Sequence, residues 1–282
     1  MSTRLTLRSP QVVAHRGSSE AAPEHTLAAY QQAIRDGAGA LECDVRLTSD
    51  GVLVCVHDRR VDRTSNGRGV VSALEYADLA ELDFGSWHAG HGRTHEVGGD
   101  PQNGPEEPDW DRRSVLTLER LLRLVSDAPR RVDLAIETKH PTRYAGHVER
   151  ALVELLDAYG LTDAGPDRPN VRVMSFSALG LRRMHALAPK IPTVLLLERL
   201  GSRYRNGTLP HRVRIAGPSI TVLRRHPQYV ERVRSWNGSV HVWTVNDPAD
   251  IDLCLALGVD AVITDRPRFV LTRIGDSGLF AV

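Results

Sequence analysis

Two acidic residues separated by one position stand near the end of an early predicted strand. Glu42 and Asp44 belong to ALECDVRL, and side chains alternate faces along a strand, so both should point to one side while Cys43 points to the other. Two carboxylates that face one another repel unless a cation lies between them, and a hard divalent cation is the usual solution. Glu42 and Asp44 are therefore candidate metal ligands, although salt bridges to arginine would also satisfy them.

Three further strand ends carry residues that could complete such a site. His15 and Arg16 follow VVA, His57 follows LVCV, and Glu137 and Lys139 stand two positions apart in AIETK. Carboxylate oxygens suit Ca²⁺ or Mg²⁺, whereas zinc prefers histidine and cysteine. Arginine and lysine beside a metal would bind an anion, most naturally phosphate, and two histidines could act as general acid and general base. This set suits phosphodiester cleavage, in which cations stabilise the developing charge and histidines move protons.

The elements that must position these residues alternate along the chain. We expect strands over residues 12–14, 40–58 (two runs around a turn at 49–51), 131–139, 171–175, 192–197, 213–215, 240–245 and 261–264. We expect helices over residues 24–36, 73–82, 117–126, 143–159, 178–187, 221–236 and 248–257. About eight strand–helix units in one chain favour a closed (β/α)₈ TIM barrel over an open sheet. In such barrels the reactive groups lie at the C-terminal ends of the strands, where the candidate residues stand.

One segment interrupts this alternation. Residues 59–113 have weak periodicity and a tract rich in glycine, proline and histidine, so we expect an irregular insertion after the second barrel strand. The whole chain, residues 1–282, is interpreted as a single barrel domain. His88, His91 and His95 in the tract suggest a zinc site, but no cysteine accompanies them, and a solvated loop is the simpler interpretation.

The composition limits the classes of partner. The formal net charge is +1, which gives no case for binding nucleic acid or a membrane surface. No G-x-G-x-x-G or Walker pattern supports a dinucleotide or P-loop site. Cys43, Cys55 and Cys254 are odd in number and lie in apolar runs, which favours reduced thiols in the cytoplasm. We see neither a signal peptide nor an apolar run that could span a bilayer, so we expect no stable membrane insertion.

The blocks HRGSSEAAPEHT, ALECDVRLTSDGVLVCVHDRRVDRTSNGRG, ELDFGSW, AIETK, VWTVND and GVDAVITDRP follow one another from about Val12 to Pro267. Taken together and in this order, they resemble the glycerophosphodiester phosphodiesterases. The resemblance implies a TIM barrel with a small insertion after the second strand. It also implies hydrolysis of small-molecule glycerophosphodiesters, such as glycerophosphocholine or glycerophosphoethanolamine, to sn-glycerol 3-phosphate and an alcohol.

The same resemblance implies one divalent ion, Ca²⁺ or Mg²⁺, and a role for each matching residue. It implies metal ligands at Glu42, Asp44 and Glu137, catalytic histidines at His15 and His57, and substrate-binding residues at Arg16, Lys139 and Trp243. Asp265 matches the terminal TDRP block, where we expect it to hold a loop.

One departure from the family pattern is His25, which stands where the family usually has the asparagine of P-E-N-T. Histidine is larger than asparagine and can carry a charge, so local hydrogen bonding and the pH optimum are the properties that this substitution would change.

Two other functions compete with this hypothesis. A lysophospholipase D or sphingomyelinase D type of activity uses similar acids and histidines, but it needs an apolar channel or a membrane-facing loop, and the insertion here is polar. A non-catalytic protein that binds phosphodiesters would keep the metal and phosphate pocket, but it would not need both histidines. Turnover of soluble diesters, turnover of lysolipids, or binding without turnover would distinguish the three.

Overall fold

The computed structural model describes residues 9–90, 109–141, 146–163, 165 and 168–277. Within these ranges, eight parallel strands close into a barrel, because β1 pairs with β2 on one side and with β9 on the other. The barrel strands are β1 (Gln11–His15), β2 (Ala40–Leu47), β4 (Asp133–Thr138), β5 (Val171–Ser175), β6 (Thr193–Leu197), β7 (Ile215–Pro218), β8 (Ser239–Val242) and β9 (Ala261–Thr264). The short β3 (Leu53–Cys55) pairs antiparallel with β2 outside the ring. The predicted TIM barrel is confirmed.

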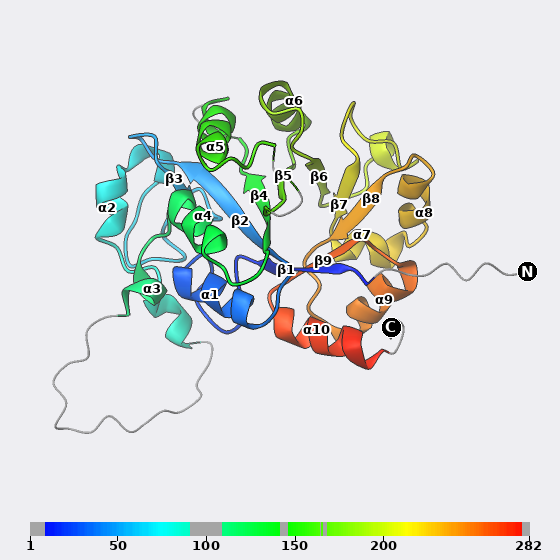
Figure 1. Cartoon of the computed structure of the whole chain (residues 1–282), viewed down its shortest axis with the longest axis horizontal. Coiled ribbons are helices and arrows are strands. Elements are labelled where there is room, and N and C mark those ends of the chain that lie inside the picture. Colours follow the sequence, from blue (N-terminus) through cyan, green and yellow to red (C-terminus); the bar gives the residue numbers. More distant parts are fainter. Residues whose placement is uncertain (1–8, 91–108, 142–145, 164, 166–167, 278–282) are drawn as a thin grey trace, which may run out of the picture.

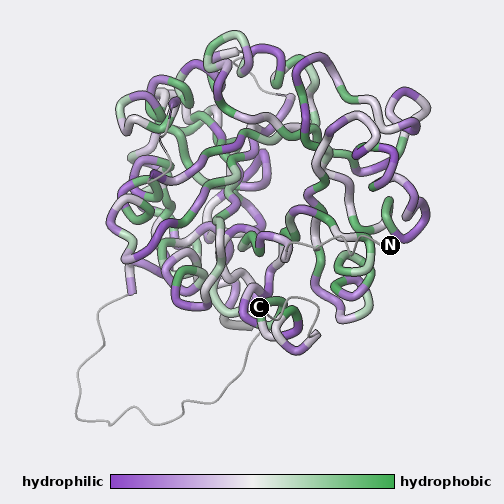
Figure 2. Tube along the Cα trace, turned by 45° about the vertical axis from the view of Figure 1, so that its right-hand side comes forward, coloured by the Kyte–Doolittle hydropathy of each residue, from purple (hydrophilic) through white to green (hydrophobic). Residues whose placement is uncertain are grey.

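Helices follow the strands and surround the barrel (Figure 1). They are α1 (Leu27–Arg35), α2 (Tyr76–Ala80), α3 (Trp110–Arg113), α4 (Leu118–Ser126), α5 (His147–Ala158), α6 (Ala178–Leu187), α7 (Ile220–Arg225), α8 (Tyr229–Arg234), α9 (Pro248–Leu257) and α10 (Pro267–Asp276). Along several outer helices, Figure 2 shows hydrophilic and hydrophobic colours alternating, as expected for helices that bury one face. None of the described helices combines the length and the apolar character needed to cross a membrane.

Strand alternation decides which side chains fill the barrel. Along β2, Leu41 and Cys43 pack outward in the core that also contains residues of the surrounding helices, whereas Ala40 belongs to an inner apolar cluster. Glu42 and Asp44 share the parity of Ala40 and point into the barrel, as predicted. The inner apolar cluster consists of Val13, Ala40, Ala135, Met174, Val194, Leu196, Ala261 and Ile263. Polar side chains at inward positions therefore gather toward the two ends of the barrel interior.

The segment between β3 and α4 builds a small satellite core. In its described residues, Val61, Val71, Leu79 and Phe84 are buried and pack with Val54 of β3. Phe84 opens the tract rich in glycine, proline and histidine, and it is buried in this satellite core. Figure 1 shows α2 and α3 on one side of the barrel, away from α7, α8 and α9. The bounds of the insertion, residues 59–113, and its membership in a single domain stay predictions.

Several predicted boundaries need correction. The single helix predicted over residues 221–236 is two helices, α7 and α8, because Pro227 between them lacks an N–H donor and cannot continue a helix. The strand predicted over 213–215 is β7, which begins at Ile215. The helix predicted over 73–82 is reduced to α2, and α10 was not predicted at all. None of these changes moves a candidate site residue from its place at a strand end.

Candidate active site

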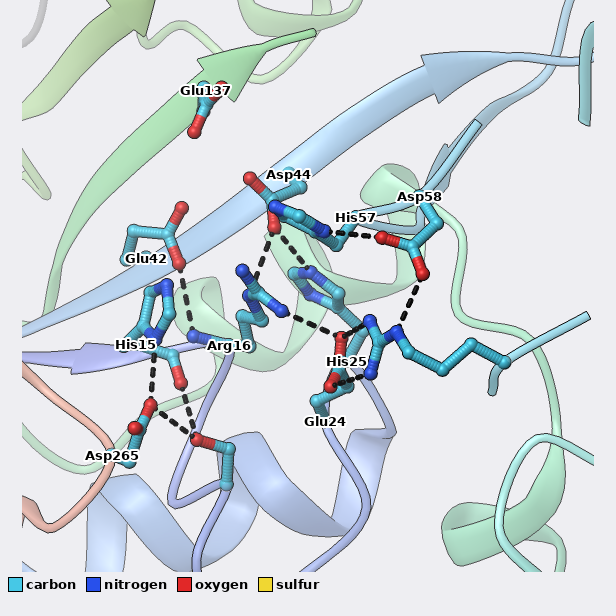
Figure 3. Close-up of polar contacts among 12 residues, drawn as sticks. His15, Arg16, Glu24, His25, Glu42, Asp44, His57, Asp58, Glu137 and Asp265 are labelled. Carbon is cyan, nitrogen blue, oxygen red and sulfur yellow. Dashed lines mark hydrogen bonds and ion pairs between the residues drawn. The ribbon is translucent and has the colours of Figure 1, made fainter. Parts of the chain in front are cut away.

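A pocket of about 170 Å³ lies at the C-terminal ends of the barrel strands. The sequence-predicted residues that line it are His15, Arg16, Glu42, His57, Glu137, Lys139 and Trp243. Asp44, which is buried, places a carboxylate oxygen within 4.8 Å of ligand atoms of Glu42 and Glu137. All eight predicted residues therefore come together at one end of the barrel, although their roles are not tested by their positions alone. Figure 3 shows most of them with their polar contacts.

The three carboxylates of Glu42, Asp44 and Glu137 are buried and repel one another. Burial, with repulsion from Asp44, raises the pKa of Glu42 well above its usual range. The same two causes raise the pKa of Glu137 to about 8. Asp44 differs because Lys139, His25 and Arg16 surround it and, despite burial, hold its pKa well below its usual range. The protein alone therefore does not stabilise all three charges, which is the condition under which a bound divalent cation is favoured.

Two cations lie among these carboxylates. The Nζ atom of Lys139 lies 2.9 Å from both Asp44 Oδ1 and Glu137 Oε1. Arg16 places Nε 3.2 Å from Asp44 Oδ2 and Nη1 2.9 Å from Glu24 Oε1. Burial lowers the pKa of Lys139, but Asp44 and Glu137 outweigh it and raise the pKa above its ordinary value. Both side chains thus stay charged and line the pocket, where they could bind an anion.

Backbone conformations in the left-handed region aim the Arg16 loop at the carboxylates. Arg16 has φ 57° and His25 has φ 61°, and the His25 N–H donates to the Arg16 carbonyl over 3.0 Å. The Arg16 N–H in turn donates to Glu42 Oε2 over 3.0 Å. At Gly17, φ is 88° and an added Cβ would lie 2.6 Å from the Ala29 carbonyl carbon, so only glycine fits. Non-glycine residues with positive φ are uncommon and gather at functional sites.

His15 is oriented by a carboxylate from the far end of the chain. Its Nδ1 lies 2.6 Å from Asp265 Oδ1, and the side chains of Ser19 and Asn246 donate to the same carboxylate over 2.9 and 2.6 Å. These hydrogen bonds outweigh burial and lower the pKa of Asp265 to about 2. The charged Asp265 favours a proton on Nδ1, which leaves Nε2 as the reactive nitrogen of His15. Asp265 therefore does more than hold a loop.

His57 has a comparable partner in its neighbour. Its Nδ1 lies 2.6 Å from Asp58 Oδ1, and Asp58 Oδ2 accepts from Arg63 Nε over 2.6 Å. Arg63 also donates to both carboxylate oxygens of Glu24, over 2.7 and 2.8 Å. Burial, together with nearby Arg16 and Lys139, lowers the pKa of His57 to about 4 even though Asp44 opposes this shift. The ring is therefore neutral over most of the pH range.

His25, the residue that departs from the family pattern, makes a hydrogen bond to the Asp44 carboxylate. It is buried, with Nε2 2.9 Å from Asp44 Oδ2 and Nδ1 2.8 Å from the Tyr30 hydroxyl. The Tyr30 hydroxyl donates to the Glu42 carbonyl over 3.1 Å. Burial lowers the pKa of His25, outweighing Asp44. A neutral His25 can donate from Nε2 to Asp44, while the single Tyr30 proton serves either the Glu42 carbonyl or His25 Nδ1.

Two aromatic rings and a carboxylate line the outer part of the pocket. Trp243 donates from Nε1 to the Gly217 carbonyl over 2.7 Å, and its ring meets that of Phe176 edge to face at 5.5 Å between centroids. Phe176 is 46% exposed, and Glu198, which is also exposed, lines the same pocket. Phe176 and Glu198 follow the ends of β5 and β6 at inward-facing positions, so their strand-end positions were a signal that our sequence reading did not use.

The zinc interpretation of the histidine-rich tract gains no support. His91 and His95 lie outside the described residues, so the trio is not tested as a whole. Among the residues that the structure does describe, Glu42, Asp44 and Glu137 form the one group of three or more potential metal ligands. These are oxygen donors, which suit Ca²⁺ or Mg²⁺.

Comparisons with known proteins agree with this site. Residues 15–269 match the model of the "Glycerophosphoryl diester phosphodiesterase family". The "Probable glycerophosphodiester phosphodiesterase 1" of Mycobacterium tuberculosis is 44% identical over 267 residues, which are 92% of this chain and 90% of that protein. The glycerophosphodiester phosphodiesterase of Bacillus subtilis is 33% identical, with coverage of 90% and 83%.

A solved structure extends the likeness to three dimensions. The phosphodiesterase of Oleispira antarctica, determined in complex with the product sn-glycerol-3-phosphate, superposes with a TM-score of 0.77 at 26% identity. The match covers 94% of this chain and 97% of that protein. Sequence, barrel and strand-end pocket thus point to one conclusion. The chain belongs to the glycerophosphoryl diester phosphodiesterase family.

Proposed function

We propose that this protein is a metal-dependent hydrolase that converts glycerophosphodiesters to sn-glycerol 3-phosphate and an alcohol. Membership of the family makes it a phosphodiesterase. The observation that carries the finer proposal is the excess of buried carboxylates over cations: among the described residues, Arg16 and Lys139 are the arginine and lysine that form ion pairs with the Glu42, Asp44 and Glu137 group. A divalent cation and one phosphodiester anion would together bring this group to neutrality.

The donor set fits a hard cation. Glu42, Asp44 and Glu137 offer oxygens within 4.8 Å of one another, and no cysteine or histidine of the described residues joins the group. We propose that these three residues hold one Ca²⁺ or Mg²⁺ ion. When bound, the ion would withdraw negative charge from a phosphate oxygen. Arg16 and Lys139 would bind the remaining phosphate oxygens as the charge on them grows.

The two histidines differ in a way that suggests separate roles. His57 is neutral because burial and two cations lower its pKa to about 4, so its free Nε2 can accept a proton from the attacking hydroxyl. Both histidines place Nδ1 against a carboxylate, Asp265 for His15 and Asp58 for His57, so the lowered pKa of His57 is the difference between them. We therefore propose that His57 is the general base and that His15 is the general acid that protonates the leaving alkoxide.

The outer pocket suits an alcohol with a positive charge. Trp243 and Phe176 offer aromatic rings, and Glu198 offers a carboxylate in the same pocket. Cationic groups are attracted to aromatic faces by about 0.5–2 kcal/mol. We propose that choline or ethanolamine esters are preferred over neutral ones, and that Glu198→Gln reduces this preference without removing turnover of a neutral diester.

The first experiment measures release of sn-glycerol 3-phosphate from glycerophosphocholine, glycerophosphoethanolamine and glycerophosphoglycerol, with Ca²⁺ or Mg²⁺ and then with chelator. We expect release that needs metal and falls about 10²-fold or more in His15→Ala and in His57→Ala. Near-normal turnover in both variants would falsify the acid–base assignment. Faster turnover of lysolipid micelles than of soluble diesters would favour a lysophospholipase D. Binding without turnover would indicate a non-catalytic protein.

The cellular setting is also a proposal. A formal net charge of +1 gives no basis for nucleic-acid binding. Cys43, Cys55 and Cys254 are buried free thiols, which suits a reducing compartment. We propose that the protein acts in the cytoplasm on small-molecule diesters, which fractionation of cells that produce it would test.

A further inference from the structure

A second pocket, of about 320 Å³, lies at the opposite end of the barrel from the candidate active site. Its wall includes residues at or near the beginnings of four successive strands: Asp133, Val171, Pro192 and Ile215. Arg172 of β5 and His241 of β8 also line it. Their register partners, Ala135 and Ala261, belong to the inner apolar cluster, so both side chains point into the barrel below that cluster.

Arg172 is a buried cation, and one edge of its guanidinium group makes no hydrogen bond to the described residues. Its residue is 8% exposed, and its Nη1 donates to Gln11 Oε1 over 2.8 Å. Nε and Nη2 are buried and have no hydrogen-bond partner within residues 9–90, 109–141, 146–163, 165 and 168–277. These two nitrogens form the edge of the guanidinium group that binds two oxygens of one carboxylate or phosphate side by side. A buried guanidinium that leaves this edge unused is costly.

His241 also has a buried ring nitrogen that lacks a hydrogen-bond partner among the described residues. It is 7% exposed, and its Nδ1 makes no hydrogen bond to any described part of the chain. Burial and the nearby positive charge of Arg172 lower its pKa well below the usual value, so the ring is neutral. A neutral ring can still donate one hydrogen bond from Nδ1. Arg172 and His241, which both line this pocket, thus carry three buried donor nitrogens that have no hydrogen-bond partner among the described residues.

The other charges around the pocket compensate one another. Asp133 accepts from Gln11 Nε2 over 3.0 Å, from Arg131 Nε over 3.0 Å and from the Asn170 N–H over 2.9 Å. Asp163 lies 2.5 Å from Lys190 Nζ in an exposed ion pair at the rim. Because each aspartate has its own cation, Arg172 is the charge in the pocket wall that lacks an ion-pair partner among the described residues.

We propose that this pocket binds a tetrahedral oxyanion of the phosphate class, held by Nε and Nη2 of Arg172 and by Nδ1 of His241. The guanidinium edge would contact two oxygens, and His241 would donate to a third oxygen that a planar carboxylate does not have. The site is independent of the proposed hydrolysis. In barrels of this kind the N-terminal end contributes to stability and the C-terminal end to catalysis, so the anion would stabilise the fold.

The test follows a ring resonance of His241 by NMR while inorganic phosphate is added to the full chain in chelator. His241→Gln assigns the resonance, and phosphate at the distant active site leaves it unmoved. We expect a saturable shift in the wild type and in Lys190→Gln, a control that removes only the exposed rim cation. Arg172→Gln should weaken the effect of phosphate on this resonance about tenfold or more. If Arg172→Gln does not fold, Arg172→Lys keeps the charge without the paired edge and should also bind more weakly.

Thermal unfolding gives a second readout that a structural role alone would not produce. Without anion, Arg172→Gln should unfold at the same temperature as the wild type or higher, since it removes a buried unpaired charge. With phosphate, the order should reverse. Repeating the titration with sn-glycerol 3-phosphate distinguishes a phosphate monoester from free phosphate, and tighter binding of either supports an oxyanion site. A resonance that does not move, or that moves equally in Arg172→Gln, would overturn the proposal and indicate that the pocket holds water instead of an anion.

Discussion

Replacing Glu137 with glutamine should have opposite effects on the metal-free and the metal-bound protein. In the structure, burial and Asp44 raise the pKa of Glu137 to about 8, from an ordinary value of 4.5. At pH 7 the unfolded chain therefore carries this carboxylate ionised, whereas the folded protein keeps it protonated. The folded state must take up a proton, and this uptake opposes folding.

The size of the effect follows from the shift. The ordinary pKa of 4.5 lies about 2.5 units below pH 7, and each unit corresponds to about 1.4 kcal/mol. Burying Glu137 therefore lowers the free energy of unfolding at pH 7 by about 3 kcal/mol. Glutamine has a similar shape and does not titrate. Because Lys139 loses one of its two carboxylate partners in the variant, we expect a net gain of about 1–3 kcal/mol in chelator. For a chain of this size that is roughly 2–6 °C in Tm.

The pH dependence of folding stability tests the direction of this effect a second time. In the metal-free wild type, the folded state holds a proton that the unfolded state has lost, so stability should fall as the pH rises from about 4.5 through 8. Glu137→Gln should show a shallower fall. A metal ligand must be ionised, so stabilisation by metal should instead grow with pH in the wild type.

The assay is thermal or urea unfolding with chelator and with a saturating divalent cation. In the wild type, metal at about 100 times its Kd should add about 2.7 kcal/mol, and Glu137→Gln should lose most of this gain. Glu198→Gln is the matched control, since it removes a pocket carboxylate that lies outside the triad. Destabilisation of Glu137→Gln in chelator, or stabilisation by metal equal to that of the wild type, would refute the reasoning.

Three further predictions concern the histidines. A base must be unprotonated, so kcat/KM should rise with pH through about 4 as His57 loses its proton, and a pH–rate profile without this acidic limb would contradict the assignment. Asp265→Asn should lower kcat about tenfold or more with little change in KM, because it removes the carboxylate that orients the His15 ring. An unchanged kcat would show that His15 needs no such partner. His25→Ala should weaken metal binding about tenfold by releasing Asp44, whereas His25→Asn, which retains a hydrogen-bonding side chain, should stay within a few-fold of the wild type. Calorimetric titration with Ca²⁺ compares the two variants, and equal affinities in both would mean that His25 does not position the ligand.

Local rules made much of the site predictable. Alternation along a strand placed Glu42 and Asp44 on one face and Cys43 on the other, and the structure confirms this arrangement. The same rule applies to Glu137 and Lys139 at the end of β4, where Lys139 Nζ reaches Glu137 Oε1. Strand alternation depends on neighbouring residues alone, so a single sequence is sufficient to read it.

Contacts across the closed barrel were harder to predict. His15 and Asp265 are 250 positions apart, and no local pattern pairs them. The inward direction of Arg172 could be predicted, since it stands two positions before the inward-facing Met174 on the same strand. The lack of a partner for its Nε and Nη2 among the described residues could not, because it depends on the side chains that other strands place at the N-terminal end of the barrel. The break between α7 and α8 also had a signal in Pro227, which a helical periodicity over residues 221–236 obscured.

The first strand, β1, pairs with the last strand, β9, so the active-site end of the barrel is complete only when the last strand has folded. Most of the polar pocket wall comes from the first 139 residues, and a chain interrupted before β9 would already contain its carboxylates. His15 would nevertheless lack Asp265, which arrives only when the last strand docks beside the first. Closing so long a loop costs entropy and slows folding. A partly folded chain would therefore bind a cation before it could protonate a leaving group, so refolding followed by activity should lag behind refolding followed by metal binding.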